Sequence, residues 1–128
     1  MHITLEADYA VRIVEQLAVN NKRMDAKLIS EKAKVPKRFC LKILRKLVSE
    51  GIVKSYRGTN GGYILSKEPS QITLGSVIEA VEGKYFISRC LSGEYECDQV
   101  CCKFHKIYDE ISSLVRDKLN SFTFDEIL

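Results

Sequence analysis

Several features that would indicate a membrane protein, a secreted protein or an enzyme are missing from this 128-residue sequence. No apolar stretch approaches the roughly 20 residues that a helix needs to cross a bilayer, so the sequence predicts no membrane span. The chain lacks the charged and then apolar leader of a secreted protein, so we expect a cytoplasmic protein with reduced cysteines. It has neither a phosphate-binding loop nor a nucleophile–base pair, so we expect no enzymatic activity.

Charge is distributed unevenly along the chain. The net charge is +3, but residues 1–67 hold 14 Lys or Arg and 6 Asp or Glu, whereas residues 68–128 hold 6 and 11. The composition, 45% hydrophobic and 29% charged, is typical of a folded globular protein. A basic half joined to an acidic half indicates a nucleic-acid partner for the first half, although a charged face can equally be a solvated surface.

The first 50 residues are predicted to form three helices. Apolar residues recur at helical spacing over 4–20, a short helix follows the capping residue Asp25, and a third helix runs from Lys37 to about Glu50. Two short helices joined by a turn at Pro36 form a helix-turn-helix. The basic residues of the third helix are Lys37, Arg38, Lys42, Arg45 and Lys46. Burial of the apolar stripe should turn them outward, and the first four are expected to contact DNA.

A β-hairpin is predicted directly after the helix-turn-helix. Short β-prone runs at 52–56 and 63–65 flank the segment Arg-Gly-Thr-Asn-Gly-Gly at 57–62, whose Asn-Gly-Gly is strong turn chemistry. A hairpin at this place is a wing, and the expected fold class is a mainly α-helical winged helix-turn-helix. Arg57 and Asn60 are expected to contact DNA, Arg57 in a minor groove. The alternative is a winged helix that contacts only proteins.

We expect residues 1–68 to form the DNA-binding domain, and residues 69–128 to supply a cysteine loop and the dimerisation helices. A helix is predicted over Thr73–Glu82, a loop over roughly 84–101, and a long amphipathic helix from Lys103. One small domain cannot cover the apolar stripe of this last helix, so we expect a homodimer. The stripe consists of Phe104, Tyr108, Ile111, Val115 and Leu119.

Four of the five cysteines fall in one short run that a histidine follows: Cys90-x6-Cys97-x3-Cys101-Cys102-x2-His105. Reduced thiols gathered this closely indicate a soft-metal or redox site. The spacing matches neither the bacterial ferredoxin run nor the paired C-x2-C of a zinc ribbon. Three thiolates on a loop could hold an iron–sulfur cluster that is open on one side, as suits a sensor. Zinc and a metal-free thiol switch remain alternatives. The fifth cysteine, Cys40, lies within an apolar stripe and is predicted to be a buried core thiol.

The segment Arg-Gly-Thr-Asn-Gly-Gly-Tyr at 57–63, with a helix-turn-helix before it and spaced cysteines and a long helix after it, resembles the IscR/NsrR (Rrf-type) family of bacterial transcription regulators. The resemblance covers essentially the whole chain. It implies a homodimer in which the long helix crosses its symmetry mate, and a double-stranded DNA operator whose binding depends on an iron–sulfur cluster.

The resemblance also implies a ligand set. Cys90, Cys97 and Cys102 correspond to the three cluster cysteines of the family. His105 matches a histidine ligand of the IscR branch, and Asp8 matches an aspartate that the other subunit supplies in the NsrR branch. Because this chain has both candidates, the type of cluster, 2Fe–2S or 4Fe–4S, stays open.

Three positions depart from the family pattern. Cys101 is an extra thiol, which we expect to be a bystander because adjacent residues rarely both bind one iron. Tyr108 stands where many members have Trp, and Leu41 replaces a polar residue that reads bases in the IscR branch. The operator sequence and the effector are therefore open. A cluster-free regulator of the same fold, switched by thiols or by a partner, and a metal-binding redox protein are the alternative functions.

Overall fold

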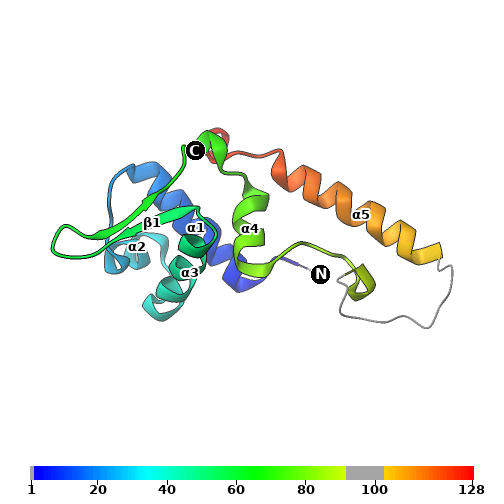
Figure 1. The fold of residues 1–128 in the computed structure, drawn as a ribbon, viewed down its shortest axis with the longest axis horizontal. Helices are drawn as coiled ribbons and strands as arrows, with labels where there is room; N and C mark the ends of the chain where they lie inside the picture. Colours follow the sequence, from blue (N-terminus) through cyan, green and yellow to red (C-terminus); the bar gives the residue numbers. More distant parts are fainter. Residues whose placement is uncertain (1, 92–102) are drawn as a thin grey trace.

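The structure is a computed structural model that describes residues 2–91 and 103–128 (Figure 1). The predicted class, mainly α-helical with a two-stranded hairpin, is confirmed. The elements, in chain order, are α1 (Leu5–Asn20), α2 (Ala26–Ala33), α3 (Lys37–Ser49), β1 (Val53–Tyr56), β2 (Gly62–Leu65), the 3₁₀ helix η1 (Pro69–Gln71), α4 (Leu74–Glu82), the 3₁₀ helix η2 (Arg89–Leu91), α5 (Lys103–Asn120) and α6 (Phe124–Ile127).

The first two helices begin where side chains satisfy free backbone donors. The Thr4 hydroxyl accepts a hydrogen bond from the Ala7 amide (3.2 Å), and the Asp25 carboxylate accepts one from the Leu28 amide (2.8 Å). α1 then buries residues three or four positions apart, which is the spacing of one helical face. These residues are Ala7, Ala10, Ile13, Val14, Leu17 and Ala18.

α3 packs against α1 and α2 and ends in a backbone motif that starts the hairpin. Gly51 adopts a φ of +77°, which glycine tolerates at this position. Its amide donates to the Val48 carbonyl, and the Ile52 amide donates to the Leu47 carbonyl (both 3.0 Å). This Schellman arrangement closes the helix and directs the chain into β1. The position of the hairpin is therefore fixed relative to α3.

The hairpin also pairs with the connection between α1 and α2. β1 and β2 are antiparallel, with Tyr56 opposite Gly62. On the other edge of β2, Met24 and Tyr63 exchange two backbone hydrogen bonds of 3.0 and 2.8 Å. A Cβ at Gly62 would lie 2.8 Å from the Met24 carbonyl oxygen, so this close pairing requires glycine.

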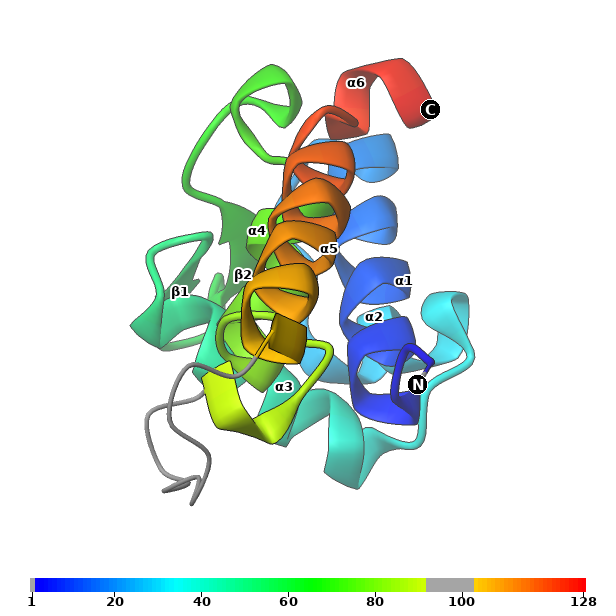
Figure 2. The same cartoon turned by 90° about the vertical axis from the view of Figure 1, so that its right-hand side faces the viewer.

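The second half of the chain contributes to the same core and then leaves it. α4 buries Val77, Ile78 and Val81 against α1 and α3, and Phe124 of α6 returns to this core. Between them α5 extends away from the domain (Figure 1), and the turned view in Figure 2 shows α4 behind it. None of the helices that the structure describes is long and apolar enough to cross a membrane.

Candidate functional site

The basic residues of α3 form one exposed surface. The buried stripe of Cys40, Ile43, Leu44 and Leu47 faces the core. The opposite side carries four exposed basic side chains, and none of them is engaged in an ion pair within the described residues. They are Lys37, Arg38, Lys42 and Arg45. Leu41 is exposed among them, so this face presents one apolar contact within a positive field.

Lys46 is an exception to the predicted outward orientation. Its ammonium group donates to the Glu6 carboxylate (2.9 Å) and to the Val81 carbonyl (3.3 Å). These contacts join α3 to α1 and to the end of α4. The expectation that all basic residues of this helix point outward is therefore wrong for Lys46, because acceptors from two neighbouring elements lie within its reach.

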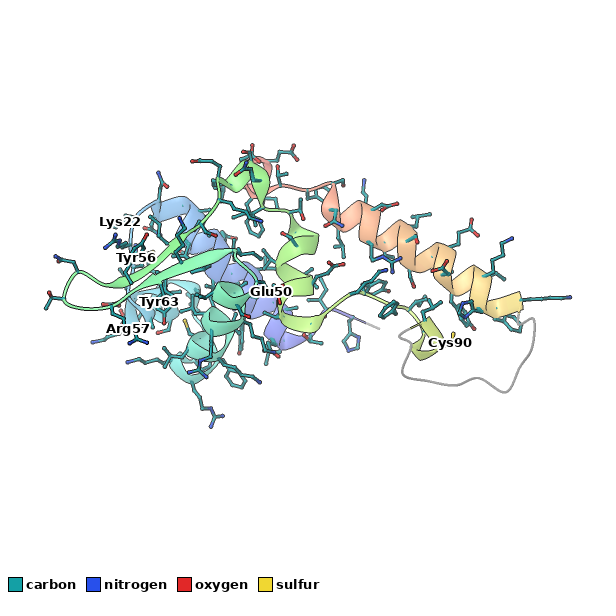
Figure 3. All side chains as sticks on the ribbon, in the orientation of Figure 1. Lys22, Glu50, Tyr56, Arg57, Tyr63 and Cys90 are labelled. Carbon is teal, nitrogen blue, oxygen red and sulfur yellow. The ribbon has the colours of Figure 1, made fainter. Side chains whose placement is uncertain are left out.

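A groove lies between α3 and the hairpin. Its volume is about 630 Å³, and its lining includes Leu41 and Arg45 from α3, Arg57 at the end of β1, and the α2 cap Asp25. Arg57 and Asn60 are both exposed. In Figure 3 Arg57 lies at the hairpin end of the molecule, far from Cys90 at the other end. Two arginines thus face one groove that contains a single carboxylate, which favours an anionic partner.

Arg23 is a basic residue near the wing that the sequence analysis did not single out. Its guanidinium carbon lies 3.7 Å from the centroid of the Tyr56 ring. Its Nη1 also donates to the Asn60 carbonyl (3.1 Å). No local pattern indicates these contacts, because Arg23 belongs to the connection between α1 and α2 and its partners lie more than 30 residues further along the chain.

The predicted metal ligands are described only in part. Cys97, Cys101 and Cys102 lie outside the described residues. Cys90 is a free, half-buried thiol whose Sγ lies 3.3 Å from the Ser88 hydroxyl. His105 is exposed in the first turn of α5. Within the described ranges, 2–91 and 103–128, no three His, Cys, Asp or Glu side chains are grouped closely enough to hold a metal ion.

The remaining candidate ligand and the fifth cysteine are fully described. Asp8 forms an ion pair with Arg12 (2.9 Å), one turn further along α1. Cys40 is completely buried, as predicted, and this burial raises the pKa of its thiol to about 11. A thiol held in its neutral form is a poor metal ligand, because metals bind the thiolate. Cys90, free and partly accessible, has the donor chemistry that a soft metal requires.

The apolar stripe of α5 divides into two parts. Val115 and Leu119 are half-buried and line a cavity that Ile78 of α4 also borders. Tyr108 is half-buried as well, and Phe104 stacks on it at 6.3 Å between ring centroids. The outer part is exposed: Phe104 59%, Ile107 48%, Ile111 39% and Leu114 68%. The predicted dimerisation stripe did not include Ile107 and Leu114. The periodicity of a helix identifies its apolar side, but it does not show which part of that side the rest of the chain covers.

A helix-turn-helix with a positively charged second helix, followed by a hairpin with arginine at its turn, defines a winged-helix DNA-binding protein. The family model of Rrf2, described as iron-dependent transcriptional regulators, matches residues 3–128. The chain belongs to the Rrf2 family, and it is a DNA-binding transcription regulator, not an enzyme. The resemblance inferred from the wing and the cysteine run is thus confirmed.

Individual relatives agree with this assignment. IscR of Pectobacterium atrosepticum is 30% identical over 100% of this chain and 79% of its own. Among solved structures, CymR (YrzC), the global cysteine regulator of B. subtilis, superposes with a TM-score of 0.79 at 26% identity, over 99% of this chain and 95% of that one. The IscR of T. potens gives a TM-score of 0.77 at 23% identity, over 99% and 85%, and confirms the fold.

Proposed function

We propose that the protein is a cytoplasmic, homodimeric regulator whose binding to a double-stranded DNA operator is controlled by an iron–sulfur cluster. The observation that carries the proposal is the run of four cysteines between the DNA-binding half and α5. A sensor needs a ligand site that both the DNA-reading surface and the dimer contact can respond to.

The contacts of the segment before the cysteine run support such coupling. The Ile87 amide donates to the hydroxyl of Ser112, which is fully buried in α5 (2.9 Å). The Arg116 guanidinium donates to the Tyr85 carbonyl (2.7 Å). The chain that leads to Cys90 is therefore fastened to α5, and a change in its order acts directly on the helix proposed to form the dimer.

Cys90, Cys97 and Cys102 are the proposed cluster ligands, and the fourth ligand is His105 or the partner's Asp8. The cluster would supply a redox-active centre that small oxidants can attack. The three cysteines and His105 fall within 16 positions of the sequence. Their thiolate and imidazole groups are donors that iron–sulfur centres accept. Asp8 would first have to leave its ion pair with Arg12.

The proposed DNA-binding surface combines α3 with the wing. Its members are Lys37, Arg38, Lys42, Arg45, Arg57 and Asn60. An α-helix such as α3 fits into a major groove, and the glycine-rich turn around Arg57 suits a minor groove. The exposed apolar face of α5 supports a homodimer, which would present two such surfaces to two half-sites.

A cluster-free regulator is the second candidate. Its support is the similar structure of CymR, a protein described as the global cysteine regulator of B. subtilis. In this chain the cysteine run would then act as a thiol switch, or a partner protein would control DNA binding.

Anaerobic purification followed by visible absorption and iron and sulfide analysis separates the two candidates. Replacing Cys90, Cys97 or Cys102 by Ala should remove the visible absorption and change operator affinity while the fold is retained. Cys40→Ala is the matched control and should keep the cluster, because Cys40 lies in the core. An iron-free reconstituted protein, with operator binding equal in the wild type and the triple Ala variant, would leave the thiol or partner switch.

A further inference from the structure

The wing is a small element that its own contacts stabilise weakly. It consists of two four-residue strands, and an isolated two-stranded hairpin is marginally stable in water. Its turn contains Gly58 and Gly61, and β2 begins at Gly62; none of these glycines offers a side chain for packing. Order at the turn must therefore come from contacts with the rest of the domain.

The connection between α1 and α2 supplies these contacts in two places. Met24 pairs with Tyr63 through two backbone hydrogen bonds and so holds β2 near its start. Arg23 reaches further, to the other strand and to the turn. Its guanidinium covers the Tyr56 ring at 3.7 Å and donates to the Asn60 carbonyl at 3.1 Å.

Arg57 lies directly between these two points of attachment. It follows Tyr56 in the chain and precedes Asn60 by three residues, so the Arg23 contacts hold the backbone on both sides of it. In Figure 3 Lys22, the neighbour of Arg23, and Tyr56 are labelled at the same end of the molecule as Arg57. A residue held on both sides loses less conformational freedom when it binds.

We propose that Arg23 is a positioning residue for operator binding: it stacks on Tyr56 and bonds the Asn60 carbonyl, and it thereby orders the turn that presents Arg57 to DNA. The inference rests on the DNA contact of the wing in the proposed function. The competing role is a direct one, in which Arg23 supplies positive charge to a phosphate. Its planar guanidinium distinguishes the two roles, because Lys keeps the charge but cannot stack in the same way while bonding the carbonyl.

Operator affinity of variants provides the first test. Arg23→Ala should weaken binding by about 3- to 10-fold, because the turn loses one exposed cation–π contact and one hydrogen bond, and only part of that loss of order reduces DNA affinity. Arg23→Lys should lose nearly as much. Lys22→Ala is the matched control, because it removes the neighbouring charge from the same connection, and we expect a smaller loss. Full affinity in Arg23→Lys would overturn the proposal.

A double variant tests whether Arg23 acts through Arg57. In an Arg57→Ala background, adding Arg23→Ala should weaken operator binding by less than about 2-fold, because the residue that Arg23 positions is gone. If the two losses simply multiply, Arg23 contacts DNA independently and the proposal is wrong.

Amide hydrogen exchange of the free protein keeps this inference separable from the proposed function. The Gly61 amide donates to the Gly58 carbonyl within the turn (3.0 Å) and should exchange faster in Arg23→Ala. The Met24 and Tyr63 amides should stay protected. Unchanged exchange at Gly61 would refute the positioning role. If instead Arg57→Ala leaves operator binding intact, the proposed DNA contact of the wing is wrong. The exchange rate of the Gly61 amide still shows whether Arg23 orders the turn.

Discussion

Replacing Ile111 by Asp should convert the proposed dimer to a monomer. The exposed apolar face of α5 is the outer part of its stripe, formed by Phe104, Ile107, Ile111 and Leu114. The exposed fractions of these four residues add up to about two fully exposed residues. Burial of a large apolar side chain contributes about 1.5–3 kcal/mol, so covering this face supplies about 3–6 kcal/mol per protomer. Two protomers then gain about 6–12 kcal/mol, which is of the same order as the estimated 4–15 kcal/mol cost of association.

The substitution acts on this balance twice. It removes about 1 kcal/mol of apolar burial from each protomer, in proportion to the exposed fraction of Ile111. It also brings a carboxylate into the contact, where burial without a partner costs several kcal/mol. The core of the domain lies elsewhere, in α1, α3, α4 and Phe124, so the variant should stay folded.

Sedimentation velocity at micromolar concentration, with circular dichroism to check folding, measures the result. Lys106→Ala is a suitable control, because it changes the net charge equally on an exposed residue of α5 that is not part of the apolar face. It should remain a dimer. A wild type that sediments as a monomer, or an Ile111→Asp variant that stays dimeric, would contradict the assignment of this face.

Three further predictions concern the DNA surface and the core. Arg57→Ala should weaken operator binding by about 1–3 kcal/mol in a gel shift, whereas Lys42→Ala should mainly reduce the slope of log affinity against log salt by about 1; an unchanged gel shift for Arg57→Ala would contradict the wing assignment. Lys46→Met should lower the free energy of unfolding by about 1 kcal/mol in a denaturant titration, because it removes hydrogen bonds to Glu6 and Val81, and an equal loss of the salt slope would indicate a DNA contact instead. Because burial raises the pKa of Cys40 to about 11, its labelling by a thiol reagent at pH 7.5 should be slow and should accelerate as the pH rises; rapid labelling of Cys40 in the native protein would contradict its burial.

Local patterns in the sequence determined the elements and their order. Helical periodicity, the caps at Thr4 and Asp25, and the glycine after α3 are interactions between residues close in the chain. The turn residues at 57–62 determined the hairpin in the same way. Burial of the apolar stripe of α3 leaves the opposite side of the helix exposed, so the exposure of Lys37, Arg38, Lys42 and Arg45 was also predictable.

Only the tertiary structure decided which long-range partners these side chains meet. Lys46 turns inward because Glu6 and the Val81 carbonyl converge on it, and Arg23 reaches Tyr56 and Asn60 because β2 pairs with the α1–α2 connection. The division of the α5 stripe has the same origin. A stripe identifies an apolar side of a helix, but the packing of α4 and of the 83–91 segment determines how much of that side stays exposed. Periodicity is a property of one element, whereas these contacts depend on how several elements are placed together.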